Sequence, residues 1–217
     1  MNNNKWWILS FLLIFFSWGL SQQTIAIQKG VQLTLKDSLY LKPQPGNPRT
    51  SEGDFLILKN KHILTVYTQF TEGVSDNSRA SLIGRVSTDN GSTWGDERVI
   101  VENEGAQNVM SLLRLKNKKI ALFYLVKNSD RDCYPVMRIS TNEGKTWSDP
   151  NPCIPPGTGY FVLNNNRVIQ LKSGRILVPV AHHQFINSEF QQDAVISCRY
   201  SDDQGATWHT SGKVTGP

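Results

Sequence analysis

Ser87-Thr88-Asp89-Asn90-Gly91-Ser92-Thr93-Trp94 is one of three copies of an octapeptide pattern in this chain of 217 residues. The other copies are Ser140-Thr141-Asn142-Glu143-Gly144-Lys145-Thr146-Trp147 and Ser201-Asp202-Asp203-Gln204-Gly205-Ala206-Thr207-Trp208. An Asp or Asn side chain in third place can accept hydrogen bonds from the backbone of a tight turn, and Gly supplies the positive φ that such a turn requires. The pattern therefore predicts a turn between two strands, with the large Trp ring buried against the core.

A second pattern recurs in phase with the octapeptides. Each copy is an apolar run, a short polar turn and another apolar run, which indicates a β-hairpin. The copies begin with a Leu at nearly equal intervals along the chain. They are Leu58-Lys59-Asn60-Lys61-His62-Ile63-Leu64, Leu115-Lys116-Asn117-Lys118-Lys119-Ile120-Ala121 and Leu171-Lys172-Ser173-Gly174-Arg175-Ile176-Leu177. Two patterns that repeat together indicate a chain built from related units.

The segments between these motifs are short and rich in β-forming residues. Outside residues 1–21, no stretch long enough to form a stable helix keeps a helical period. We expect strands over residues 62–70, 82–86, 120–126, 175–181 and 194–199. Four strands in a repeat of about 55 residues are typical of a propeller blade. The sequence therefore predicts an all-β protein with the architecture of a β-propeller.

The pattern Ser-x-Asp-x-Gly-x-Thr-Trp resembles the Asp box, or bacterial neuraminidase repeat. Over roughly residues 45–210 the chain is similar to the sialidase superfamily. This resemblance implies a six-bladed β-propeller, of which residues 22–217 hold about three blades. It also implies an active site at one end of a central channel, away from the Asp boxes at 87–94, 140–147 and 201–208. We therefore expect the box residues to be structural.

Arg49 and Asp76 are the strongest candidates for that site. Arg49 precedes the first hairpin, where the resemblance implies an Arg that binds the substrate carboxylate, although Thr50-Ser51 replaces the family's Ile-Pro. A guanidinium matches a carboxylate bidentately, which Lys cannot do. Asp76 lies eleven residues before Ser87, where the resemblance implies the acid/base that protonates the leaving group. The alternatives are an exposed Arg near a turn and an Asp that shapes an Asx-turn.

Further candidates for substrate binding follow from the same resemblance: Glu52, Asn108, Asp132, Arg167 and His183. Glu52 is expected to orient Arg49, Asn165-Asn166-Arg167 to open the third inner strand, and His182-His183 to close its hairpin. Typical sialidases carry a second carboxylate-binding Arg a short distance before the acid/base Asp. Thr71 occupies that position here, and Arg79 lies nearby without matching it.

No metal or cofactor is expected. Adjacent histidines in a strand point to opposite faces, so His182 and His183 are not expected to chelate one metal ion. The three cysteines are an odd number and show no metal-ligand spacing, so we expect core residues without chemistry at Cys133, Cys153 and Cys198. The 23 basic and 18 acidic residues are scattered without a block of five like charges, which argues against a nucleic-acid partner.

Residues 1–21 are predicted to be a secretory signal peptide. Lys5 is their only charge, residues 6–16 are apolar apart from Ser10, and small residues precede a cleavage site between Ser21 and Gln22. A spanning helix needs roughly 20 apolar residues, so this run is short, and a retained membrane anchor is the alternative. We expect an exported protein that is periplasmic, cell-surface or secreted.

The resemblance implies an exported exo-α-sialidase-like glycoside hydrolase that acts on sialylated or other acidic glycans. Sialidases use a Tyr nucleophile assisted by a Glu, and in the family both come from later blades. We find neither before Pro217, so we expect this chain to be an N-terminal half without activity of its own. The alternative is a non-catalytic Asp-box propeller that binds glycans or proteins.

Overall fold

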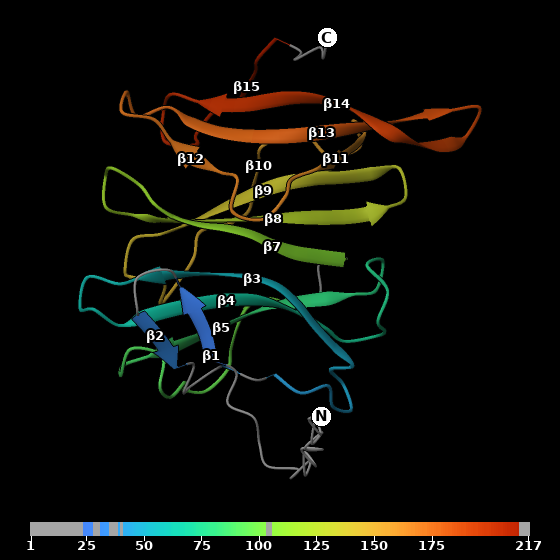
Figure 1. Ribbon diagram of the computed structural model, residues 1–217. Coiled ribbons are helices and arrows are strands. Elements are labelled where there is room, and N and C mark those ends of the chain that lie inside the picture. Colours follow the sequence, from blue (N-terminus) through green and yellow to red (C-terminus); the bar gives the residue numbers. More distant parts are fainter. Residues whose placement is uncertain (1–23, 28–30, 35–38, 40, 103–105, 213–217) are drawn as a thin grey trace, which may run out of the picture. The chain divides into compact units, whose positions relative to one another are not determined.

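A computed structural model describes residues 24–27, 31–34, 39, 41–102 and 106–212 of the chain (Figure 1). The chain divides into two compact units, Met1–Lys36 and Asp37–Pro217. In the first unit, β1 (Thr24–Ile27) and β2 (Val31–Thr34) form an antiparallel pair. The expected signal peptide over residues 1–21 lies outside the described residues.

The second unit contains three repeats of β-strands. The first repeat is a four-stranded antiparallel sheet in the order β3 (Arg49–Ile57), β4 (Ile63–Phe70), β5 (Ala80–Ser87) and β6 (Arg98–Val101). The second repeat has β7 (Ala106–Arg114), β8 (Ile120–Ser129), β9 (Asp132–Ser140) and β10 (Asn151–Pro152). The third has β11 (Tyr160–Val162), β12 (Ile169–Gln170), β13 (Ile176–Ile186), β14 (Glu189–Ser201) and β15 (His209–Thr210). The predicted all-β fold is confirmed, and each repeat has four strands when β11 and β12, which both pair with β13, are counted as one interrupted strand.

The third repeat departs from the prediction in two places. Its inner strand opens at Tyr160 and is interrupted between β11 and β12, so Arg167 lies within the interruption and does not open the strand. Leu163 and Val168, on either side of the exposed residues 164–167, are buried, which explains why the chain leaves the sheet there. The hairpin closes at Asn187-Ser188, both with positive φ, so His182 and His183 lie inside β13 and do not close it.

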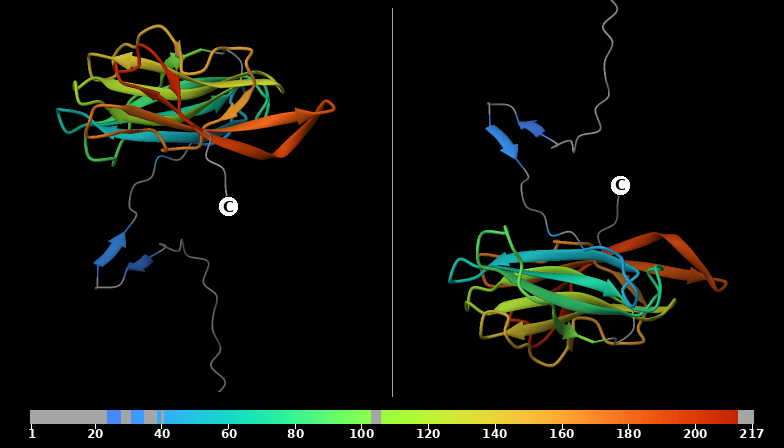
Figure 2. Two further views of the ribbon diagram at one scale, coloured as in Figure 1. Left: turned by 90° about the horizontal axis from the view of Figure 1, so that it is seen from above. Right: turned by 90° about the horizontal axis from the view of Figure 1, so that it is seen from below.

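The three repeats stack on one another within the second unit (Figures 1 and 2). A parallel bridge between Tyr160 in β11 and Cys133 in β9 joins the second and third repeats into one nine-stranded sheet. Both views of Figure 2 show the hairpin of β13 and β14 projecting beyond the other strands. The strand β8 lies in the middle of the stack, and its side chains from Ile120 to Val126 are all buried.

The three octapeptides form the predicted turns with nearly identical geometry. In the first, the backbone amide of Gly91 donates to Ser87 Oγ at 2.8 Å, and that of Thr93 donates to Asp89 Oδ1 at 2.8 Å. The corresponding bonds in the other two copies measure 2.7–2.9 Å. Trp147 and Trp208 are partly buried against the hydrophobic core, as predicted.

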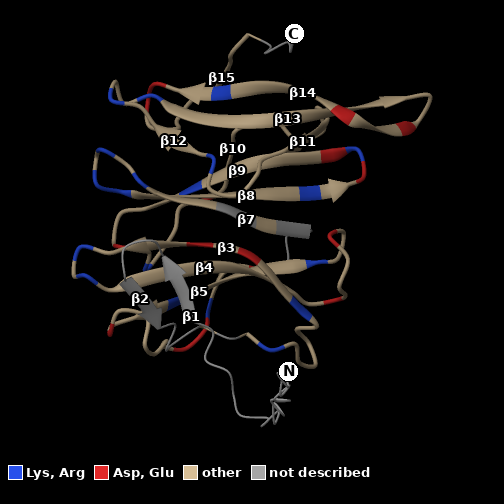
Figure 3. Ribbon diagram, in the orientation of Figure 1, with Lys and Arg blue, Asp and Glu red and all other residues tan. Residues whose placement is uncertain are grey.

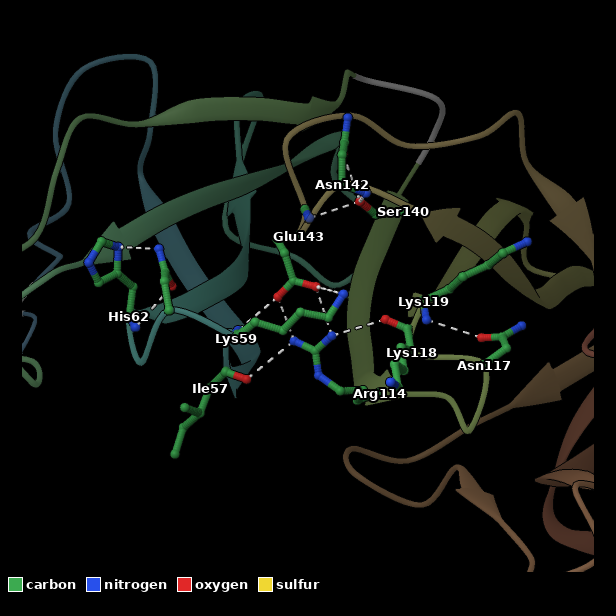
Figure 4. Close-up of polar contacts among 12 residues, drawn as sticks. Ile57, Lys59, His62, Arg114, Asn117, Lys118, Lys119, Ser140, Asn142 and Glu143 are labelled. Carbon is green, nitrogen blue, oxygen red and sulfur yellow. Dashed lines mark hydrogen bonds and ion pairs between the residues drawn. The ribbon is translucent and has the colours of Figure 1, made fainter.

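Each of the later turns also contacts the preceding repeat. Glu143 in the second turn accepts two hydrogen bonds from Arg114, at 2.9 and 2.8 Å, and one from the backbone amide of Lys59 at 3.0 Å (Figure 4). Arg98 in β6 donates to the Gly144 carbonyl at 2.6 Å, and Asn151 in β10 donates to the equivalent Gly205 carbonyl at 2.5 Å. The turns thus stabilise the stack of repeats, in keeping with a structural role.

The cysteines follow the expectation from the sequence. All three are free thiols; Cys133 and Cys153 are buried and Cys198 is half-buried. Burial raises the pKa of the Cys133 thiol to about 12, so it carries no reactive thiolate at neutral pH. None of the described residues belongs to a helix that could cross a membrane.

Candidate functional site

The strand register separates two ends of the stack. Ser87 at the end of β5 pairs with Ile63, whereas Ala80 at its start pairs with Phe70, so the octapeptide turn and the β4–β5 loop lie at opposite ends. The β8–β9 and β13–β14 turns lie at the same end as the β4–β5 loop, on the right in Figure 1. Figure 3 shows several Lys and Arg positions, in blue, along the turns at the other end. We call the end with the β4–β5 loop the strand-end site.

Arg49 begins β3 at this end and is held in place by several contacts. Its Nη1 donates to Asp76 Oδ1 at 2.6 Å and to the Val74 carbonyl at 2.8 Å, and its Nη2 donates to Ser51 Oγ at 3.2 Å. Its guanidinium also lies 4.5 Å from the centroid of the Phe70 ring. These contacts fix the plane of the guanidinium at the protein surface.

Asp76 comes from the β4–β5 loop and meets Arg49 across the start of the first repeat. The carboxylate is 75% exposed and the Arg49 side chain 29% exposed, so an incoming ligand has access to both. The sequence predicted that both residues belong to one site, and the structure brings them into direct contact. In this contact Asp76 is a hydrogen-bond acceptor, not a proton donor.

A pocket of about 530 Å³ opens between the second and third repeats at the same end. Its lining includes Lys127, Arg131, Tyr160, Phe185 and Phe190. Lys127 Nζ lies 5.1 Å from the Tyr160 ring centroid and donates to Asn77 Oδ1, next to Asp76. This hydrogen bond connects the pocket to the Arg49–Asp76 pair. Cations beside aromatic rings suit a ligand with hydroxyl groups and apolar faces.

Three of the predicted substrate-binding residues have contacts that the sequence did not predict. Asp132 accepts hydrogen bonds from Asn128 Nδ2 and from the Gly157 amide, both at 2.8 Å, and so fastens the β8–β9 turn to the segment before β11. Glu52 accepts a hydrogen bond from Ser51, so it reaches Arg49 only through that hydroxyl. Asn108 is half-buried in β7, and its Oδ1 has no hydrogen-bond partner among the described residues.

The other two predicted residues lie at the third repeat. His183 shares a hydrogen bond with the Gln191 carbonyl at 3.1 Å, and its ring stacks on Phe190 at 4.8 Å. It therefore supports the wall of the pocket without being one of its lining residues. Arg167 is exposed, and no hydrogen bond or ion pair joins it to another described residue. His182 stacks on Phe161, so the two histidines contact different rings, and the described residues hold no cluster of metal-ligating side chains.

Sequence reasoning missed Lys127, Arg131 and Tyr160. Lys127 and Arg131 flank the tip of the β8–β9 hairpin, and Tyr160 begins β11. Charged residues at a hairpin tip are usual for solvent-exposed turns, so no local pattern distinguishes them. A signal was nevertheless available, because the matching tip of the first repeat carries Asp76.

Residues 67–216 match the family described as BNR repeat-like domain. Three solved structures resemble the fold at low identity. A protein of unknown function from Dyadobacter fermentans DSM 18053 has 20% identity and a TM-score of 0.62, and the match covers 80% of this chain and 57% of that one.

The other two are sialidases. The Hadza microbial sialidase Hz136 has 16% identity and a TM-score of 0.61, with 78% of this chain and 38% of that chain covered. The Trypanosoma rangeli sialidase in complex with 2,3-difluorosialic acid has 18% identity and a TM-score of 0.57, with 78% and 31% covered. The chain thus spans less than two thirds of each of these structures.

Proposed function

Because the chain belongs to the family of BNR repeat-like domains, we propose that it forms part of a sialidase-type glycoside hydrolase. In this proposal the strand-end site binds the carboxylate of a terminal sialic acid or related acid sugar. The observation that carries it is the Arg49–Asp76 contact, which puts a fixed guanidinium and an exposed carboxyl at one accessible position. The resemblance of the fold to sialidases supports the proposal.

Arg49 and Asp76 have linked roles in the proposed reaction. The substrate carboxylate takes the place of Asp76 on the Arg49 guanidinium, where a bidentate pair forms. Asp76 is then released from its 2.6 Å contact, takes a proton from solvent and gives that proton to the glycosidic oxygen as the bond from this oxygen to the anomeric carbon breaks. We assign neither a Tyr nucleophile nor its Glu partner to this chain.

The pocket beside this pair holds the rest of the sugar. Tyr160 and Phe190 offer ring faces for the apolar side of a pyranose, and Lys127 and Arg131 donate to its hydroxyl groups. We further propose that the protein is exported, with Gln22 as the mature N-terminus. Terminal sequencing of the protein from its native source tests that cleavage site.

Hydrolysis of a fluorogenic sialoside by the full-length protein tests the assignment of Asp76. Asp76→Asn is expected to lower kcat by at least ~100-fold, because a positioned general acid contributes about 10²–10⁴-fold. Asp193→Asn, an exposed change in β14, is the control and is expected to leave turnover unchanged. Unchanged turnover of the Asp76 variant would overturn the acid/base role.

The second candidate function is binding of acidic glycans without cleavage. It is favoured by one observation, the direct Arg49–Asp76 contact, which leaves Asp76 serving as a clamp for the guanidinium. Under this alternative the full-length protein binds sialosides and shows no turnover, and Asp76→Asn changes affinity alone.

A further inference from the structure

Each repeat places an Arg two residues before the Ser of its octapeptide: Arg85, Arg138 and Arg199. In the first two repeats, the Nε–H of this Arg donates to a buried Tyr hydroxyl. The Arg85–Tyr67 distance is 3.1 Å and the Arg138–Tyr124 distance is 3.0 Å. Because the same hydrogen bond occurs at the same position in two repeats, we regard it as a feature of the repeat.

The third repeat lacks this bond because two large residues are replaced by small ones. Tyr67 pairs with Ile83 across the strands and Tyr124 with Val136, whereas Val180 pairs with Ser197. Val180 therefore occupies the position of the Tyr in the other repeats. Ser197 occupies the position of Ile83 or Val136. Arg199 Nε is buried and has no hydrogen-bond partner among the described residues. A buried donor without an acceptor lowers the stability of the folded state, so this unpartnered group requires an explanation.

A cavity of about 380 Å³ lies beside Arg199, and we call it the Arg199 pocket. It is lined by Phe161, His182, Val195, Ser197, Arg199 and Thr210, with two residues of the segment before β11. Phe161 and His182 stack with centroids 4.2 Å apart and form a flat wall. The Arg199 guanidinium lies 5.6 Å from the Phe161 centroid, and its Nη1 donates to Thr210 Oγ1. An apolar wall with a few convergent polar groups, in this range of volume, is the usual construction of a small-molecule site.

The charge in the Arg199 pocket is uncompensated within the described part of the chain. Arg85 has a carboxylate partner, Glu97, at 2.7 Å, whereas no described carboxylate pairs with Arg199. Burial of the half-buried Arg199 side chain lowers the pKa of its guanidinium. An anion in the pocket would supply the missing charge.

We propose that the Arg199 pocket binds a small organic carboxylate with a flat body. The carboxylate pairs with the Arg199 guanidinium and accepts from Ser197 Oγ, and the flat body lies against the stacked rings of Phe161 and His182. The pocket is built from β11, β13, β14 and β15 and shares no lining residue with the pocket of the strand-end site. The proposal goes beyond the proposed function and does not depend on it.

Titration of the full chain with sodium benzoate, followed by NMR of the arginine Nε–H groups, tests the proposal. Benzoate is expected to shift the Arg199 signal saturably and to leave those of Arg85 and Arg138 in place, because these donors already have Tyr acceptors. Benzamide, which has the same shape without the charge, is expected to bind at least about tenfold more weakly.

Two variants make the test specific. Val180→Tyr restores the acceptor of the other repeats and Ser197→Val restores the residue of the second repeat, so each is expected to weaken benzoate binding at least about tenfold. Either variant suffices if the other does not fold. The proposal is overturned if benzoate causes no saturable shift of the Arg199 signal, if benzamide binds equally well, or if a folded variant binds benzoate as the parent chain does.

Discussion

Glu143 joins the first two repeats through a single carboxylate. Both of its oxygens accept hydrogen bonds from Arg114, and one also accepts a hydrogen bond from the backbone amide of Lys59 (Figure 4). The Lys59 ammonium forms an ion pair with it, with Nζ 3.3 Å from Oε1. The hydrogen bonds from Arg114 lower its pKa from 4.5 to about 2, with further contributions from Lys59. The fourth position of the octapeptide holds Asn90, Glu143 or Gln204, so the repeat pattern marked it as variable and gave no hint of this role. Its partners come from elsewhere in the chain, which a local pattern cannot reveal.

Glu143 should make stability depend on pH in a defined window. A carboxyl whose pKa is depressed on folding adds stability above its unfolded pKa of 4.5, and this is lost as the pH falls toward about 2. Because 24% of the side chain is exposed, solvent screening limits the contribution to ~1–2 kcal/mol. Glu143→Gln is expected to lower the free energy of unfolding by that amount at pH 7 and to flatten its fall between pH 4.5 and 2.

Urea denaturation at pH 7 and pH 3 measures both effects. Glu189→Gln, an exposed carboxylate at the start of β14, is the matched control and should change neither value. Equal pH profiles for the parent chain and Glu143→Gln would show that Glu143 does not clamp the repeats.

Turns were the elements that the sequence predicted best. Ser, Asp or Asn, and Gly form bonds within one octapeptide, so local chemistry determines the turn. The interruption between β11 and β12 was missed, because it depends on where Leu163 and Val168 are buried. The strand-end site was predicted in part for the same reason. Arg49 and Asp76 belong to one repeat, whereas Lys127 and Tyr160 reach the site only when the second and third repeats pack together.

Gly144 and Gly157 provide a test of how the turns pack on the neighbouring repeat. Their φ values are +76° and +75°, but an added Cβ would lie 2.7 Å from buried Leu64 at Gly144 and would meet nothing within 4 Å at Gly157. Gly157→Ala is expected to cost ~1–2 kcal/mol of unfolding free energy from backbone strain alone. Gly144→Ala is expected to cost a further ~1–3 kcal/mol from the clash with Leu64. Equal shifts in the urea midpoint would contradict this packing.

Within the second unit, the second repeat lies between the first and the third. The side chains of β8 from Ile120 to Val126 are all buried, whereas β3 exposes Phe55 and Ile57 by 65% and 60%. Sequence repeats indicated three similar units, but not which of them is most deeply buried. The stacking order determines that.

Hydrogen exchange should report this order. The amides of β8 are expected to exchange at least about tenfold more slowly than those of β3, because local opening is least favourable where packing is densest. Mass spectrometry of peptides covering the two strands measures the difference. Faster exchange in β8 than in β3 would contradict the placement of the second repeat at the centre of the stack.

In the proposed function, Arg49 binds the carboxylate of an acid sugar. The affinities of N-acetylneuraminic acid and its methyl ester for the full-length protein and for Arg49→Lys test this role, with Arg79→Lys as the control. If Arg49 has this role, the ester binds the parent protein at least about tenfold more weakly than the acid, and Arg49→Lys removes most of that difference while Arg79→Lys keeps it. If acid and ester bind the parent protein equally, or if Arg49→Lys preserves the difference, Arg49 does not bind the carboxylate.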